Sequence, residues 1–163
     1  MKILFLIRHA KAETAFTLND FERPLNERGK ADAPMMAKRL LQKKIKIDAF
    51  ISSPAKRAKK TAELFSAAYG LGDEDIIYVS ALYQAPPEIF FEVISHLDEP
   101  FNSVAIFAHN PGITHLAQEL VPEIKLDNMP TCAVLAVQAD IPSWSAFAKS
   151  KKEFLFFDYP KNT

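Results

Sequence analysis

The stretch Ile3-Leu4-Phe5-Leu6-Ile7-Arg8-His9 decides the fold of this chain, because five successive apolar residues end at an arginine and a histidine. Such an apolar run is typical of a strand covered on both faces, as in a parallel sheet. The segments Ala49-Phe50-Ile51 and Val104-Ala105-Ile106-Phe107 have the same character. We therefore expect these three segments to form the buried centre of one sheet.

Further strands and several helices surround these segments. Shorter strand patterns occupy residues 75–79, 133–137 and 154–157. Apolar stripes with helical spacing occupy residues 33–41, 58–68 and 113–120, with a shorter helix over 88–97. Strands and helices alternate, which predicts an α/β fold built as a three-layer α/β/α sandwich with a mostly parallel central sheet. Pro34 is expected to kink its helix or to mark a late start, and Gly70 to close the second helix.

Length and charge narrow the class of protein. The 163 residues suit one domain spanning residues 1–163, with 48% hydrophobic and 25% charged residues. Twenty basic and twenty acidic residues cancel, so nothing global indicates binding to nucleic acid or to an anionic membrane. Any site for an anion must therefore be local.

Cysteine and histidine usage indicates a reduced protein without a metal. Cys132 is the single cysteine, which excludes an internal disulfide and is expected to be a small buried hydrophobe. The first apolar run is too short for a signal peptide or a membrane span. No His-Glu-x-x-His or paired-carboxylate spacing occurs among the four histidines, so we expect no metal and no cofactor. A cytoplasmic location follows from these expectations.

Three predicted strands end in polar residues. The first ends at Arg8-His9, the second at Ser52-Ser53-Pro54 with Arg57 beyond, and the third at His109-Asn110-Pro111-Gly112. The carboxyl ends of strands in an open α/β sheet share one edge, where ligands bind. Ser53 and Asn110 each precede a proline, a pattern that predicts a helix N-cap with free N–H groups aimed at an anion.

These residue types suit the transfer of a phosphoryl group. His9 would lie in the middle of a pocket formed by Arg8, Arg57 and His109. A neutral imidazole is a nucleophile near neutral pH, and arginines bind phosphoryl oxygens in pairs. The pocket would offset the charge that develops on the equatorial oxygens, and water would then cleave the phosphohistidine.

Four sequence blocks, in order over roughly residues 1 to 140, resemble the histidine phosphatase superfamily and its small SixA-type phosphohistidine phosphatases. The blocks are Arg8-His9-Ala10-Lys11-Ala12, Asp20-Phe21-Glu22-Arg23-Pro24-Leu25-Asn26, Ile51-Ser52-Ser53-Pro54-Ala55-Lys56-Arg57-Ala58 and His109-Asn110-Pro111-Gly112. The resemblance implies a phosphoglycerate mutase-like fold without the large helical insertion. It also implies that His9 accepts the phosphoryl group, that Arg8, Arg57 and His109 bind its oxygens, and that Arg23 helps from its loop.

One departure from the family bears on the substrate. Many relatives carry a catalytic glutamate where this chain has Gln84, which cannot donate an acidic proton. Glu88 is expected on a helix, and Glu13 and Asp20 remain as unassigned carboxyl groups near the site. Phosphohistidine leaves as an imidazole and makes a weaker demand on an acid, so we expect a phosphorylated protein as substrate, with Ser53 and Asn110 also binding it. The short connection over residues 80–102 predicts an open, shallow pocket.

Three alternatives remain open at this stage. The chain could be a phosphomonoesterase for a small phosphorylated metabolite, a non-catalytic phosphate-binding module, or a mutase, the last weakened by Gln84 and the short connection. His96 and His115 are expected to be structural or surface histidines. Trp144, Phe147 and the tail Phe154-Leu155-Phe156-Phe157 are expected in the core or in a dimer contact. The sequence leaves the oligomeric state and the pathway open.

Overall fold

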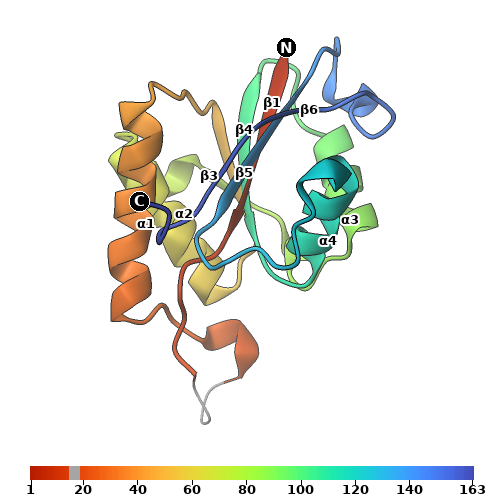
Figure 1. The fold of residues 1–163 in the computed structure, drawn as a ribbon. Coiled ribbons are helices and arrows are strands. Elements are labelled where there is room, and N and C mark those ends of the chain that lie inside the picture. Colours follow the sequence, from red (N-terminus) through yellow and green to blue (C-terminus); the bar gives the residue numbers. More distant parts are fainter. Residues whose placement is uncertain (15–18) are drawn as a thin grey trace.

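The computed structural model describes residues 1–14 and 19–163, which form a six-stranded sheet between two layers of helices (Figure 1). The strands are β1 Lys2–Arg8, β2 Ala49–Ser52, β3 Ile76–Tyr78, β4 Ser103–Ala108, β5 Val134–Ala139 and β6 Glu153–Asp158. The α-helices are α1 Glu27–Gln42, α2 Lys56–Ala68, α3 Pro87–Ser95 and α4 Gly112–Leu120. Short 3₁₀ turns are η1 Asp20–Glu22, η2 Asp73–Asp75, η3 Ser80–Leu82, η4 Pro122–Ile124 and η5 Trp144–Ala146. None of the described helices is long and apolar enough to cross a membrane.

The order of the strands places the three predicted strand ends side by side. The order across the sheet is β3-β2-β4-β1-β5-β6. The pairs β1–β4, β2–β4 and β2–β3 are parallel, whereas β5 is antiparallel to both β1 and β6. Because β5 alone runs against the other strands, the predicted mostly parallel sheet is confirmed. The neighbours β2, β4 and β1 then bring their carboxyl ends to one edge.

The first apolar run is buried on both faces of the sheet, as predicted. Leu4 and Leu6 belong to the apolar cluster that includes residues of α3 and α4, whereas Phe5 and Ile7 belong to the cluster that includes residues of α1 and α2. Figure 1 shows these two pairs of helices on opposite faces of the sheet. All four side chains are buried. Successive strand residues point to opposite faces, so a strand between two helical layers needs apolar residues at every position.

The helix α1 begins earlier than the apolar stripe suggested. Asn26 caps it, because its side-chain oxygen accepts a hydrogen bond from the Gly29 N–H at 2.9 Å. Pro34 lies inside the helix, so the predicted late start is wrong: the cap at Asn26 and the buried stripe outweigh the lost N–H donor. Gly70 has φ +77° just beyond α2 and closes that helix as expected.

The predicted caps at Ser53 and Asn110 are wrong in detail, because α2 begins at Lys56 and α4 at Gly112. The Ser53 hydroxyl accepts a hydrogen bond from the Ala55 N–H but also bonds to a side chain of the site. The side-chain oxygen Oδ1 of Asn110 accepts one from the hydroxyl of Thr114. Both side chains are thus engaged in tertiary contacts, and the helices start without side-chain caps.

Candidate active site

The carboxyl edge of the sheet brings together two buried histidines. In the sheet register Arg8 pairs with Ala108, so His9 and His109 leave β1 and β4 at the same level. The centroids of their rings lie 5.3 Å apart. Ser53 leaves the neighbouring strand β2 at this edge, and its N–H donates to the Phe107 carbonyl at 3.0 Å.

The ring of His9 is oriented so that its Nε2 carries a lone pair and faces Arg57. Its Nδ1 lies 2.7 Å from the Ala10 carbonyl oxygen, which can only accept, so Nδ1 carries the proton and Nε2 holds a lone pair. The Nε–H of Arg57 donates to that Nε2 at 3.3 Å. Burial lowers the pKa of His9 well below its usual value, and the charges of Arg57 and Arg8 add to this effect. The ring is therefore neutral at neutral pH.

His109 is also neutral and is fixed by Ser53. The Ser53 Oγ accepts from the Ala55 N–H at 3.2 Å and lies 2.7 Å from His109 Nε2. We assign the hydroxyl proton to this second bond, so Nε2 accepts and the proton of His109 sits on Nδ1. Burial, followed by the charge of Arg57, lowers the pKa of His109 to about 3.

We call Arg8, His9, Ser53 and His109 the floor of the site. Arg8 donates from Nη1 to the Met129 carbonyl at 2.8 Å. Its Nε and the Nδ1 of His109 are buried and have no hydrogen-bond partner among the described residues. Buried donors are nearly always paired, so two unpaired donors beside one nucleophilic nitrogen fit an anionic ligand placed between them.

We call Asp20, Arg23 and Tyr83 the rim of the site, and Arg57 joins the rim to the floor. Arg57 is buried in the first turn of α2, and it donates from Nη1 to the Asp20 carbonyl at 2.6 Å and from Nη2 to Asp20 Oδ2 at 2.9 Å. The Tyr83 hydroxyl donates to the same Oδ2 at 2.6 Å, and Arg23 reaches Oδ1 at 3.1 Å. Burial alone would raise the pKa of Asp20, but hydrogen bonds from Tyr83 and Arg57 outweigh it and lower the pKa to about 2.

Two predicted binding residues lie beside the floor and act on other protein groups in this structure. Arg23 donates to Asp20 and, through Nη1, to the Glu13 carbonyl at 3.1 Å. Asn110 donates from Nδ2 to Asn128 Oδ1 at 2.7 Å and to the Met129 carbonyl at 3.4 Å. Asn110 thereby holds the segment whose Met129 carbonyl accepts from Arg8.

Tyr83 is the site residue that sequence reasoning missed. Its ring packs edge-on against His109, with centroids 5.6 Å apart, and edge-on against Phe21, with centroids 5.1 Å apart. The only signal in the sequence was its place directly before Gln84, at the end of the segment where relatives carry their acid. Gln84 itself is exposed, and Glu88 is exposed in the first turn of α3, as expected for a helical residue.

Gly112 allows the segment that carries Tyr83 to pack directly against the turn that follows His109. A Cβ atom at Gly112 would collide with the Ala85 carbonyl oxygen. The first turn of α4 and the segment that carries Tyr83 therefore approach as closely as two backbones can, which only glycine allows.

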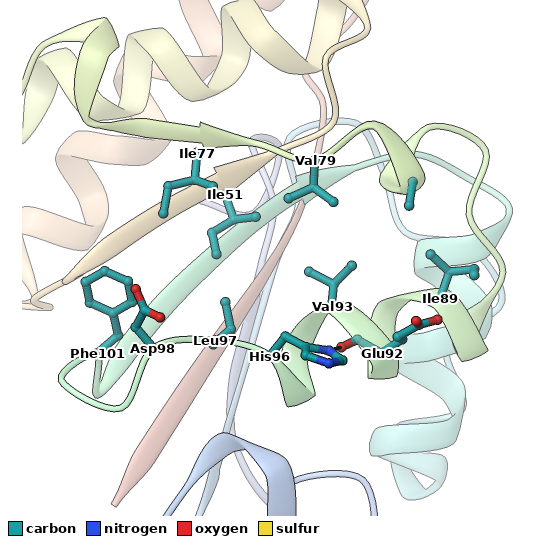
Figure 2. A pocket seen from close by; sticks show the side chains of 11 residues that line it. Ile51, Ile77, Val79, Ile89, Glu92, Val93, His96, Leu97, Asp98 and Phe101 are labelled. Atoms are coloured by element: carbon teal, nitrogen blue, oxygen red, sulfur yellow. Dashed lines mark hydrogen bonds between the residues drawn. The ribbon is translucent and has the colours of Figure 1, made fainter.

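The remaining candidates lie away from the floor. An apolar groove runs between the β2–β3 edge of the sheet and α3, and it is lined by Ile51, Val79, Val93 and Phe101 among others, but by none of the floor residues (Figure 2). His96 and His115 are exposed, and Trp144 and Phe147 are fully buried in the core. Cys132 is buried, and burial raises the pKa of its thiol. Within residues 1–14 and 19–163, no group of three or more His, Cys, Asp or Glu side chains is placed to hold a metal ion.

Comparisons with known proteins identify the family. The model of the histidine phosphatase superfamily (branch 1) matches residues 4–82, which carry Arg8, His9 and Arg57. An uncharacterised protein of Mycobacterium tuberculosis is 30% identical over 111 residues, 68% of this chain and 67% of that protein. The SixA protein of Agrobacterium tumefaciens superposes with a TM-score of 0.82 at 27% identity, covering 98% of each chain. The protein histidine phosphatase SixA in complex with tungstate gives a TM-score of 0.82 at 25% identity and the same coverage.

The fold and the site define a phosphatase with the phosphoglycerate mutase-like architecture. The chain belongs to the histidine phosphatase superfamily, and within it to the SixA type. His109 lies beyond the residues that the family model matches, and the sheet brings it to the site.

Proposed function

We propose that this chain removes the phosphoryl group from phosphohistidine in a protein, through an intermediate in which the phosphorus is bonded to His9 Nε2. One observation carries the proposal: a neutral imidazole, with an unprotonated Nε2, lies among cationic and unpaired donors. These are Arg57 Nε at 3.3 Å, the buried Arg8 Nε and the buried Nδ1 of His109.

The first step forms the bond between His9 Nε2 and phosphorus. The P–N bond of the substrate breaks, and its electron pair stays on the leaving imidazole, which takes a proton from solvent. Arg8, Arg57 and the Nδ1–H of His109 donate to the equatorial oxygens, where negative charge develops. The bond from His9 Nδ1–H to the Ala10 carbonyl stabilises the positive charge that the phosphorylated ring acquires.

The second step returns the enzyme to its starting state. A water oxygen attacks phosphorus, the P–Nε2 bond breaks and its electron pair returns to His9. The water proton passes to solvent, and inorganic phosphate leaves. The same donors serve both steps, because the phosphoryl oxygens remain between Arg8, Arg57 and His109 throughout.

Three observations favour phosphohistidine in a protein as the substrate. Gln84 stands where relatives carry a carboxylic acid, and an imidazole leaving group makes a weaker demand on an acid than an alkoxide does. The connection between β3 and β4, which the structure describes in full, contains η3 and α3 and no large helical insertion. The related protein histidine phosphatase at 25% identity supports the same substrate class. A cytoplasmic location belongs to the proposal, and the buried thiol of Cys132 is compatible with it.

Ser53, Asn110 and Arg23 are proposed to act through their neighbours. Ser53 fixes the orientation of His109, and Asn110 holds the Met129 segment against Arg8. Arg23 reaches the site through the carboxylate of Asp20. We predict that each contributes to binding the phosphoryl group by positioning these partners.

Trapping the intermediate tests the proposal directly. The protein is mixed with a ³²P-labelled phosphohistidine peptide, quenched in base and mapped by mass spectrometry. We expect an acid-labile, base-stable label on His9 and no label when His9 is replaced by asparagine. The matched control is His115→Asn, which removes an exposed histidine from α4. A label on another residue, or none during turnover, would overturn the proposal, and so would loss of the reaction in a chelator.

Comparing substrates separates the proposal from its alternatives. Rates are measured for the phosphohistidine peptide and for a panel of phosphate esters of sugars and small acids. A preference for the peptide supports the proposal, whereas a preference for an ester by orders of magnitude would identify a metabolite phosphatase. Binding of the phosphopeptide without turnover would identify a non-catalytic module.

A further inference from the structure

The Nε–Nη2 edge of the Arg57 guanidinium is shared between His9 and the carboxylate of Asp20. Its Nε donates to His9 Nε2 at 3.3 Å, and its Nη2 donates to Asp20 Oδ2 at 2.9 Å. These two donors form the edge that binds two oxygens of one anion. A phosphoryl group bonded to His9 Nε2 would place its oxygens along this same edge, so Asp20 Oδ2 holds a position that such an oxygen needs.

We infer that Asp20 is a specificity-determining residue that competes with the substrate's phosphoryl group for Arg57. The anion must displace the Asp20 carboxylate from Nη2 before Arg57 can bind the phosphoryl oxygens. This inference rests on the proposed function only in placing the anion between His9 and Arg57.

The two partners differ in their freedom to move. The Arg57 side chain is 5% exposed, whereas that of Asp20 is 43% exposed. Asp20 lies in the three-residue turn η1, and the main-chain bond from Arg57 Nη1 to the Asp20 carbonyl does not depend on the carboxylate. A rotation of the Asp20 side chain therefore frees Nη2 while Arg57 stays in place.

The Asp20 carboxylate has donors at the rim other than Arg57. Arg23 donates to Oδ1 from Nε and Nη2, both at 3.1 Å, and Tyr83 donates its hydroxyl proton at 2.6 Å. These contacts lower the cost of releasing Asp20 from Arg57, since the carboxylate is not left without donors.

Competition of this kind discriminates between anions by charge. A singly charged carboxylate or sulfate ester would replace the single negative charge of Asp20 beside Arg57 with another, so little binding free energy would be gained. A doubly charged phosphoryl group brings more charge to Arg57 and the unpaired floor donors, so it can displace Asp20. The same competition weakens the binding of inorganic phosphate and favours its release after hydrolysis.

Calorimetric titration with tungstate, a doubly charged tetrahedral oxyanion, tests the inference on the full chain. We expect Asp20→Asn and Asp20→Ala to bind tungstate about threefold to fivefold more tightly than the wild type, the upper part of the range for a partly exposed charge pair. The matched control is Glu22→Gln, which removes the same charge from an exposed position of the same turn and is expected to stay within about twofold of the wild type.

Each outcome decides the inference. Tighter binding in the two Asp20 variants alone supports it. Unchanged or weaker binding overturns it, because the carboxylate would then hold Arg57 in place for the anion. Equal tightening in Glu22→Gln also overturns it, since a long-range field would suffice. A wild-type chain that does not bind tungstate would overturn the proposed anion site itself, which separates the two failures.

Discussion

The floor and the rim of the site use opposite physical means to handle charge. In the floor, His9, Ser53 and His109 are buried and Arg8 is half-buried, and the two histidines are neutral because burial lowers their pKa values. Its donors are fixed by main-chain atoms such as the carbonyls of Ala10 and Met129, and two of them are unpaired among the described residues. The rim is more exposed, and its charged side chains neutralise one another. Under the proposed function, the reaction takes place at the floor, and the inferred competition at the rim controls which anions bind there.

Replacing the nucleophile should separate the two regions most strongly. We expect His9→Asn to reduce kcat/KM for a phosphohistidine peptide by at least about 10³-fold, because the covalent route is lost. Tungstate affinity should stay within about threefold of the wild type, because Arg8, Arg57 and His109 keep their donors. Steady-state kinetics and calorimetry measure the two effects. Comparable activity in this variant would place the chemistry elsewhere.

Removing a floor donor should cost less than removing the nucleophile. We expect His109→Gln to reduce kcat/KM by about 10²-fold to 10³-fold, the range for one donor to a developing charge. Most of the loss should fall on kcat, because the Nδ1–H bond strengthens as charge develops on the oxygens. A drop confined to KM would contradict this role and indicate simple ground-state binding.

Acid should destabilise the protein through its floor. His9 and His109 have folded pKa values below the ordinary 6.5, so below about pH 6.5 the unfolded chain binds protons that the folded chain does not. The free energy of unfolding should therefore fall as pH decreases from about 6.5, by about 1.4 kcal/mol per pH unit for each histidine. Urea titrations from pH 7 to pH 5 measure this slope.

The His109→Gln variant is the control for the pH effect. Without the contribution of His109, its free energy of unfolding should fall less steeply with decreasing pH over the same range. The carboxyl of Asp20, with its pKa at about 2, titrates well below that range and does not interfere. An unchanged slope would show that His109 is protonated in the folded state.

Changes at the rim should have the smallest effects. We expect Arg23→Gln to change KM for the phosphohistidine peptide by no more than about threefold, because its ion pair with Asp20 is partly exposed. The kcat value should stay close to that of the wild type. A loss as large as that of the floor variant would remove the distinction between floor and rim.

The sequence predicted that the floor residues lie together, because they follow strands that apolar runs mark clearly, whereas their roles in the reaction stay a prediction. Once β1, β2 and β4 are neighbours, Arg8, His9, Ser53 and His109 must share an edge. The predicted starts of α2 and α4 were wrong because a local cap pattern does not account for hydrogen bonds between the capping side chain and residues distant in the sequence. Ser53 bonds to His109, which lies 56 positions away.

The rim could not be read from the sequence in the same way. Asp20 was recognised only as a carboxyl group near the site, and its bond to Arg57 spans 37 positions. It lies in a short turn outside the helices and strands, where no apolar periodicity fixes the direction of a side chain. Tyr83 follows η3 and gives no periodic signal either.

The contact between Gly112 and the Ala85 carbonyl has a consequence for how the site keeps its shape. Because Gly112 has no Cβ atom, the backbone that follows His109 can contact the backbone that follows Tyr83. An alanine at this position would push the two segments apart, and the Tyr83 ring would lose its contact with the His109 imidazole. The spacing of the site is thus set by a residue that offers no functional group, and activity would suffer although every reacting atom was retained.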